Sequence, residues 1–159
     1  MGMTDSYLSI LDASLDNKLE ILDRLTELTA KQGALLDAEK LDAEAFHALT
    51  EEKSSLIEKL ESLDDGFQLV YNNVKQTLDT DRQVYSAEIT AMQKKIAGIM
   101  ERSNHLMAEE SRNKAKADKH FALLHKEVKN VKTNQQYAAN YYKTMNKLTG
   151  EPVFMDKKK

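Results

Sequence analysis

Apolar side chains recur at alternating steps of three and four residues between Phe46 and Val74. The series runs Phe46, Leu49, Lys53, Leu56, Leu60, Leu63, Phe67, Val70 and Val74. This spacing places the side chains on one side of an α-helix, and it is the seam of a coiled coil, which must be buried against another helix. Only Lys53 breaks the apolar rule. We expect the Lys53 stem to follow the seam while its ammonium meets an acid at the edge.

Three further segments carry the same alternation. The first holds Leu8, Leu11, Leu15, Lys18, Leu22, Leu25, Thr29 and Gln32; the second holds Ile89, Met92, Ile96, Ile99, Ser103 and Leu106; the third holds Phe121, Leu124, Val128, Val131, Gln135, Ala138, Tyr142 and Met145. A second apolar line, formed by Ile21, Leu28 and Leu35, lies beside the first of these seams. The first helix is therefore predicted to touch at least two neighbours.

Side chains suited to helix N-caps mark where the first helices begin. Thr4 is the candidate cap of the first helix, with Asp5 in the following turn, and Asp42 is that of the second, with Glu44 in the following turn. Thr80 is the candidate cap of the third helix, where it forms a capping-box pattern with Gln83. We expect a turn at residues 38–41. The seam keeps its phase across Gly66, which favours a continuous second helix to about Leu78.

The sequence predicts an all-α fold, an elongated antiparallel helical bundle. Residues 81–148 contain no proline and only Gly98, so we expect three helices with a long third helix. The alternative is four helices, with a break near residues 108–119, where no apolar side chain is larger than alanine. Gly150 and Pro152 end the helical pattern. Residues 1–150 are predicted to form a single bundle domain, and residues 151–159 a disordered basic tail.

Charge is divided unevenly between the two halves of the chain. Residues 1–80 hold 17 acidic and 7 basic side chains, a net charge of −10, whereas residues 81–159 hold 9 and 16, a net charge of +7. The simpler interpretation is that acidic helices flank a basic one. A nucleic-acid interface would use the basic stripe Arg112, Lys114, Lys116, Lys119, Lys126, Lys129 and Lys132. Most of that stripe lacks aromatic stacking partners and the whole chain is acidic, so no nucleic-acid partner is predicted.

The residues do not indicate an enzyme. The chain has no cysteine, which excludes thiolate metal sites and cysteine nucleophiles and is compatible with a cytoplasmic location. Glu44 and His47 have the spacing of one half of a ferritin-like metal site, but no second such pair exists. We therefore predict no metal, no cofactor and no catalytic residue. No apolar run reaches the roughly 20 residues of a membrane span, so membrane insertion is not expected.

A bundle of this kind acts through its surfaces, and an amphipathic partner helix is the natural ligand of an apolar groove. The candidate partner-binding residues lie in the C-terminal segment, where three tyrosines too closely spaced to share one core face accompany aliphatic side chains. They are Val128, Val131, Tyr137, Tyr141, Tyr142, Met145 and Leu148. The alternative interpretation is that these residues only close the end of the bundle.

A short acidic link and the helix after it carry the pattern D-x-E-x-F/L-x-x-L-x-x-x-K-x-x-L-I-x-x-L. It falls on Asp42, Glu44, Phe46, Leu49, Lys53, Leu56, Ile57 and Leu60. In this the chain resembles the FlgN-type flagellar export chaperones, through its motif in the first half and through its helical character in the second. The opening "YLSILDASLDNKLEIL" also suits the sibling FliT-type chaperones.

The resemblance implies a cytoplasmic chaperone that binds the amphipathic C-terminal helices of hook-associated proteins. It would prevent their premature assembly and deliver them to the flagellar type III export gate. Family members are expected to dock at the gate through the C-terminal region and a tyrosine there, for which Tyr137, Tyr141 and Tyr142 are the candidates. The alternative from another class is a structural coiled-coil protein that acts through self-association, for example as a homodimer.

Overall fold

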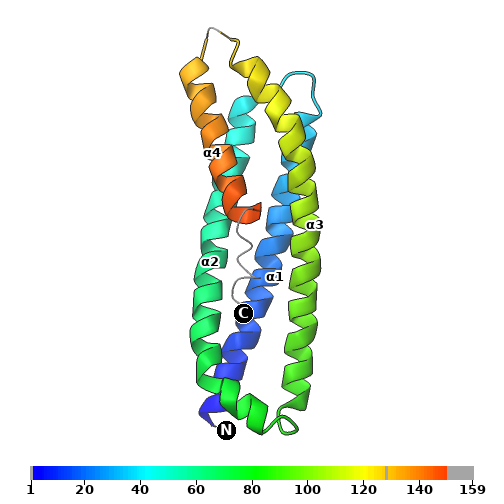
Figure 1. Cartoon of the computed structure of the whole chain (residues 1–159), viewed down its shortest axis with the longest axis vertical. Coiled ribbons are helices and arrows are strands. Elements are labelled where there is room, and N and C mark those ends of the chain that lie inside the picture. The colour runs from blue at the N-terminus through cyan, green and yellow to red at the C-terminus, as the bar shows by residue number, and fades with distance from the viewer. Residues whose placement is uncertain (1, 128, 150–159) are drawn as a thin grey trace.

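The structure is a computed structural model that describes residues 2–127 and 129–149, and within these ranges it contains four α-helices (Figure 1). They are α1 (Met3–Leu36), α2 (Ala43–Thr80), α3 (Ser86–Leu124) and α4 (Val131–Thr149). The all-α prediction is confirmed. We call the end with the N-terminus and the α2–α3 connection the proximal end, and the opposite end the distal end.

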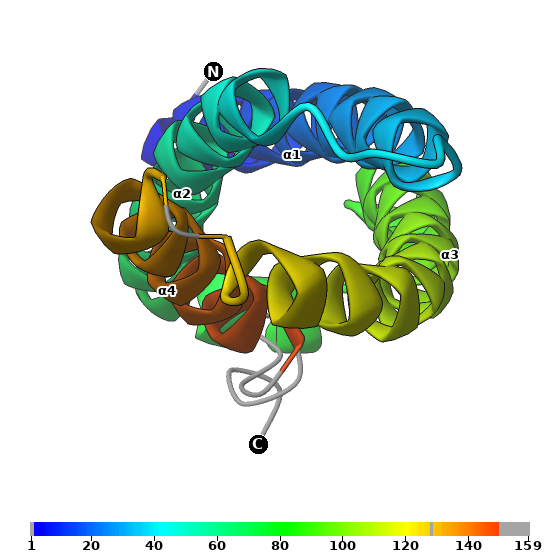
Figure 2. The same cartoon turned by 90° about the horizontal axis from the view of Figure 1, so that it is seen from above.

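The helices form a ring in which the chain neighbours α2 and α3 face each other diagonally (Figure 2). Helix α1 packs against α2 and α3, and α4 packs against the same two helices. Helices α1 and α3 run toward the distal end, whereas α2 and α4 run back (Figure 1). As the second apolar line predicted, α1 touches two neighbours. Leu28 of that line is fully buried, and Ile21 and Leu35 pack against the core.

The seams of the four helices meet in two apolar clusters. The proximal cluster consists of Leu8, Leu11, Leu15, Leu22, Leu25, Ile57, Leu60, Val74, Leu78, Met92, Ile99, Leu106 and Leu148. The distal cluster consists of Leu36, Leu41, Phe46, Ala117, Phe121, Leu124, Ala138, Tyr141 and Met145. Burial of these side chains, at about 25 cal/mol per Å² of apolar surface, is the main force that holds the helices together.

The expectation of three helices with a long third one is wrong. The alternative of four helices gives the right number, but the break is not at residues 108–119, which are helical; it lies between Leu124 and Val131. Residues 108–119 remain helical because small and polar side chains occupy the seam there: Glu110, Asn113 and Ala117 are all buried. At the actual break Asn130 adopts a positive φ of 61°, a conformation that asparagine tolerates better than most residues.

The predicted helix ends agree with the structure only in part. Asp42 is confirmed as the N-cap of α2, since its carboxylate accepts a hydrogen bond from the Ala45 amide at 3.1 Å. Helix α2 also continues through Gly66, as predicted. The N-cap of α1 is Gly2 rather than Thr4, and Thr80 is the last residue of α2 rather than a cap. The predicted tail at 151–159 lies outside the described residues.

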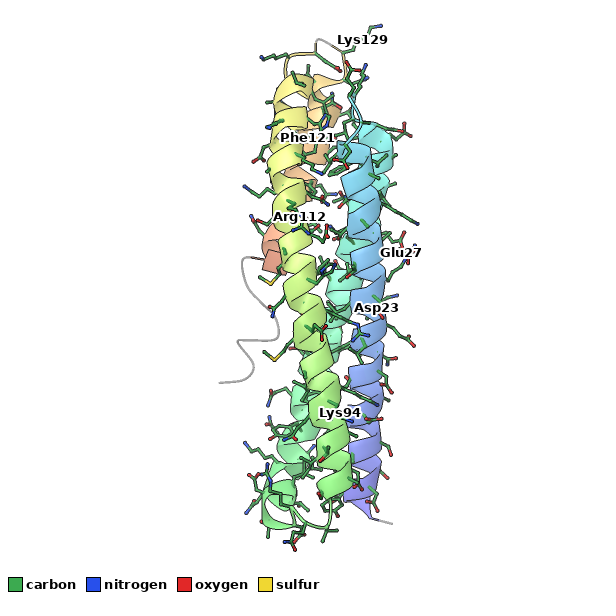
Figure 3. The ribbon with its side chains drawn as sticks, turned by 90° about the vertical axis from the view of Figure 1, so that its right-hand side faces the viewer. Asp23, Glu27, Lys94, Arg112, Phe121 and Lys129 are labelled. Carbon is green, nitrogen blue, oxygen red and sulfur yellow. The ribbon has the colours of Figure 1, made fainter. Side chains whose placement is uncertain are left out.

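Ion pairs join acidic α1 and its C-cap to basic α3, as the simpler interpretation of the charge division predicted; α2, which is also acidic, lies diagonally from α3 and does not flank it. Lys95 lies 2.7 Å from Asp12 and Arg102 lies 2.7 Å from Asp23. Figure 3 shows these two helices side by side, with Asp23 on the face where they meet. Lys116 lies 2.6 Å from Asp37. Part of the basic stripe is therefore neutralised within the chain.

Candidate partner-binding groove

Helix α4 is too short to cover the whole length of the bundle. It has 19 residues, whereas α1, α2 and α3 have 34, 38 and 39. It packs beside the distal half of α2, where Tyr141 contacts Phe46 and Tyr137 contacts His47. In the proximal half nothing among the described residues takes the place opposite α1 (Figure 1).

That uncovered half contains an apolar groove between α2 and α3, with α1 as its floor. Its cavity has a volume of about 420 Å³. It is lined by Leu15, Lys18, Asp64, Phe67, Gln68, Tyr71, Leu78, Asp79, Arg82, Ile89, Met92, Gln93, Ile96, Ile99 and Met100. The side chains deep in the groove belong to the proximal cluster, whereas Tyr71 and Met100 at its rim are 37% and 41% exposed.

The charged residues that line the groove are paired within the chain. Lys18 on α1 and Asp64 on α2 form a buried ion pair in its floor. At the proximal end, Arg82 lies 3.9 Å from Asp79. The groove therefore presents mainly apolar and aromatic surface, with the uncharged amides Gln68 and Gln93 also in its lining.

A buried polar layer lies beneath α4, where α1, α2 and α3 meet. The Lys53 ammonium donates to Glu110 Oε1 at 2.6 Å and to Gln32 Oε1 at 2.9 Å, and all three side chains are buried. Burial lowers the pKa of Lys53, although the charge of Glu110 opposes this shift. The expectation that Lys53 would meet an acid is confirmed, but that acid lies inside the bundle and not at the edge.

The predicted partner-binding residues on α4 are placed in different environments. Tyr141, Met145 and Leu148 are buried. Tyr137 is half-buried and stacks on His47, with ring centroids 4.0 Å apart. Tyr142 is also half-buried, and its hydroxyl donates a hydrogen bond to the Asp118 carboxylate. Val131 is half-buried, and Val128 lies outside the described residues. As expected from their spacing, the three tyrosines do not share one core face.

Tyr141 and Tyr142 form an aromatic cluster with residues of α2 and α3. The Tyr141 ring lies 5.0 Å from that of Phe46 and 6.0 Å from that of Phe121, and the Tyr142 ring lies 5.9 Å from that of Phe121. Burial raises the pKa of both tyrosines above the usual range of a phenol. These contacts fix α4 in the distal half of the bundle, so they determine where the groove begins.

The groove itself was missed by the sequence analysis. Ile89, Met92, Ile96 and Phe67 were assigned to core seams, and they do face the bundle axis. The seams do not reveal that, among the residues that the structure describes, no fourth helix covers these side chains. The sequence feature that could have revealed the groove is the short length of the last helix. A helix that starts after a break and ends near residue 149 is shorter than the three helices before it.

Within 2–127 and 129–149 there is no group of three His, Asp or Glu side chains able to hold a metal ion. His47 faces Glu51 at 3.0 Å. A search of the same residues finds no helix with the length and apolar character needed to cross a membrane.

Comparison with known proteins gives one match. A protein-family model described as "FlgN protein" matches residues 3–148, which is nearly the whole chain. No curated protein matches the chain, and neither does any solved structure.

Proposed function

The chain belongs to the FlgN family of flagellar export chaperones, and we propose that it binds the amphipathic C-terminal helices of hook-associated proteins in the cytoplasm. In this proposal the bound helix cannot polymerise prematurely and is delivered to the type III export gate. The observation that carries the proposal is the apolar groove beside α4, because a client helix needs an apolar seat of this form. A client helix buries there the face that it later buries in the flagellum.

The residues predicted on α4 enter this proposal in two roles. Leu148 joins the proximal cluster at the end of α4, so a client helix next to α4 can contact it directly. Tyr141 and Met145 pack against α2 and α3, and a client reaches them only if α4 moves. Tyr137 and Tyr142 keep part of their surface exposed, and we propose these two for docking at the export gate.

Light scattering coupled to size-exclusion chromatography tests the proposal. The chain is measured alone and with synthetic peptides that span the C-terminal helices of hook-associated proteins. We expect a monomer that forms a 1:1 complex with at least one peptide and gains helicity in circular dichroism. A stable oligomer that binds none of the peptides would contradict the proposal and favour the self-associating coiled coil.

Docking at the gate needs a separate experiment. Tyr137→Ala and Tyr142→Ala variants are compared with wild type for capture of the export-gate component and, in parallel, for binding of the client peptide. We expect one variant to lose gate capture while it keeps client binding. If both variants capture the gate component as wild type does, these tyrosines are not the docking residues.

A further inference from the structure

The cross-section of the bundle changes along its length. Four helices surround the axis in the distal half, and the described residues supply only three in the proximal half (Figure 1). The change occurs where α4 ends, because Leu148 contacts the proximal cluster that contains Ile57 and Leu60. The groove therefore continues the seat in which α4 lies, between the same two helices.

The length of the groove suits a short helix. Its lining extends along α2 from Asp64 to Asp79 and along α3 from Ile89 to Met100. At a rise of 1.5 Å per residue the stretch of α2 spans about 22 Å, which corresponds to a helix of about 15 residues.

The lining also indicates the chemistry of the occupant. Phe67 and Tyr71 stack with their ring centroids 6.2 Å apart, and aromatic side chains of this kind anchor interfaces. Met92 and Met100 face them from α3, and methionine adapts its shape to different partner side chains. Of the lining charges, Lys18 and Asp64 form a buried ion pair, and the exposed Asp79 and Arg82 lie only at the proximal end. The occupant is therefore expected to present an apolar, uncharged face.

We propose that the groove seats one amphipathic client helix of about 15 residues, end to end with α4, so that the client completes the four-helix cross-section. This inference rests on the proposed function and adds the place and the chemistry of the binding site. Binding in this seat requires no displacement of α4. The binding free energy is expected to come from apolar contact, so affinity should change little with salt concentration.

Cross-linking locates the client directly, because the chain has no cysteine and one substitution creates a unique thiol. A Met100→Cys variant of the full chain is mixed with a client peptide that carries one cysteine on its apolar face. We expect a disulfide-linked 1:1 product. The matched control is Leu69→Cys, on the outer surface of α2 and 69% exposed, which should give little product.

Other occupants would give different products. If Met100→Cys chains link to each other rather than to the peptide, the groove seats a second copy. If a Met100→Cys, Phe154→Cys double variant closes an internal disulfide that the peptide does not prevent, the seat belongs to the C-terminal segment of the same chain. Either result overturns the proposal of a client helix in the groove.

Affinity measurements separate this proposal from the proposed function. Met100→Glu should weaken peptide binding by about tenfold or more, because it places a charge against the apolar face, whereas Leu69→Glu should leave affinity unchanged. Wild-type affinity should be similar at low and high salt. If wild type binds the peptide and Met100→Glu binds it equally well, the groove is not the site and the chaperone function stands. If wild type binds none of the peptides, both proposals fail.

Discussion

The ammonium of Lys53 on α2 lies 2.6 Å from a carboxylate oxygen of Glu110 on α3, and both side chains are buried in the bundle. The pair joins two helices that lie diagonally across the ring, and Gln32 of α1 accepts a second hydrogen bond from the same ammonium. Three helices are thereby held in one register at this level. A shift of α2 or α3 by one turn would leave a charge buried without its partner, and a shift of α1 would remove the hydrogen bond to Gln32.

Removal of one member of this pair is expected to destabilise the fold strongly. Lys53→Met or Glu110→Gln should each lower the free energy of unfolding by about 3–5 kcal/mol, because a buried charge then loses its partner. The Lys53→Met, Glu110→Leu double variant should recover much of that loss. Urea denaturation gives the three values, with the exposed Lys59→Met as the control. Additive losses in the double variant would show that the two groups do not act as a pair.

Two glycines within helices should respond oppositely to alanine. A Cβ at Gly66 meets nothing within 4 Å, so Gly66→Ala should raise the free energy of unfolding by about 0.5–1 kcal/mol through helix propensity. A Cβ at Gly33 would lie 3.0 Å from Oδ1 of Asn113, whose side-chain amide donates to the Thr29 carbonyl at 2.9 Å. Gly33→Ala should therefore gain less or lose stability. Equal gains in urea denaturation would mean that Asn113 moves freely.

Removing the hydroxyls of Tyr141 and Tyr142 should have different effects on stability. The Tyr141 hydroxyl is buried and has no hydrogen-bond partner among the described residues, so Tyr141→Phe should leave stability unchanged or raise it by about 1 kcal/mol. Tyr142→Phe removes the hydrogen bond to Asp118 and should cost up to about 1 kcal/mol. Thermal unfolding of both variants checks the order. A loss in Tyr141→Phe larger than that in Tyr142→Phe would contradict it.

Alkaline pH should weaken the distal end of the bundle. In the folded chain the pKa of Tyr141 and of Tyr142 is raised above the value of about 10 that a tyrosine has when unfolded. Above pH about 10 the unfolded state loses these protons while the folded state keeps them, so stability present at lower pH falls as the pH rises. The Tyr141→Phe, Tyr142→Phe double variant should show a shallower fall. Identical pH profiles would show that both phenols ionise freely.

Much of the fold follows from local patterns in the chain. The seam from Phe46 to Val74 predicted α2, and Asp42 was correctly predicted as its N-cap. The break before α4 was not predictable in the same way. Residues 108–119 look unsuited to a core, yet Glu110 and Asn113 find buried partners on other helices, so the helix continues through them.

The candidate site was likewise predictable only in part. The residues that line the groove are recognisable as seam positions, because Ile89, Met92 and Ile96 recur with helical spacing. Their exposure to a partner depends on where α4 ends, which in turn depends on the aromatic contacts of Tyr141 with Phe46 and Phe121. No spacing rule connects those three residues, so the predicted site was assigned to α4 itself rather than to the space beside it.

The sequence by itself determined the helical class, the face that α1 buries and the places where α2 begins and continues. It predicted the buried face of α2 and of α4 only in part, since Leu63 is half-buried and Gln135 is exposed. These depend on hydrogen bonds and side-chain spacing within a few residues of one another. Only the tertiary structure decided that α2 and α3 lie diagonally, that Lys53 meets an acid 57 positions away, and that residues 2–127 and 129–149 place no fourth helix in the proximal half. The physical reason is that a buried charge or an uncovered seam is defined by residues distant in the chain, and periodicity carries no information about which helix those residues belong to.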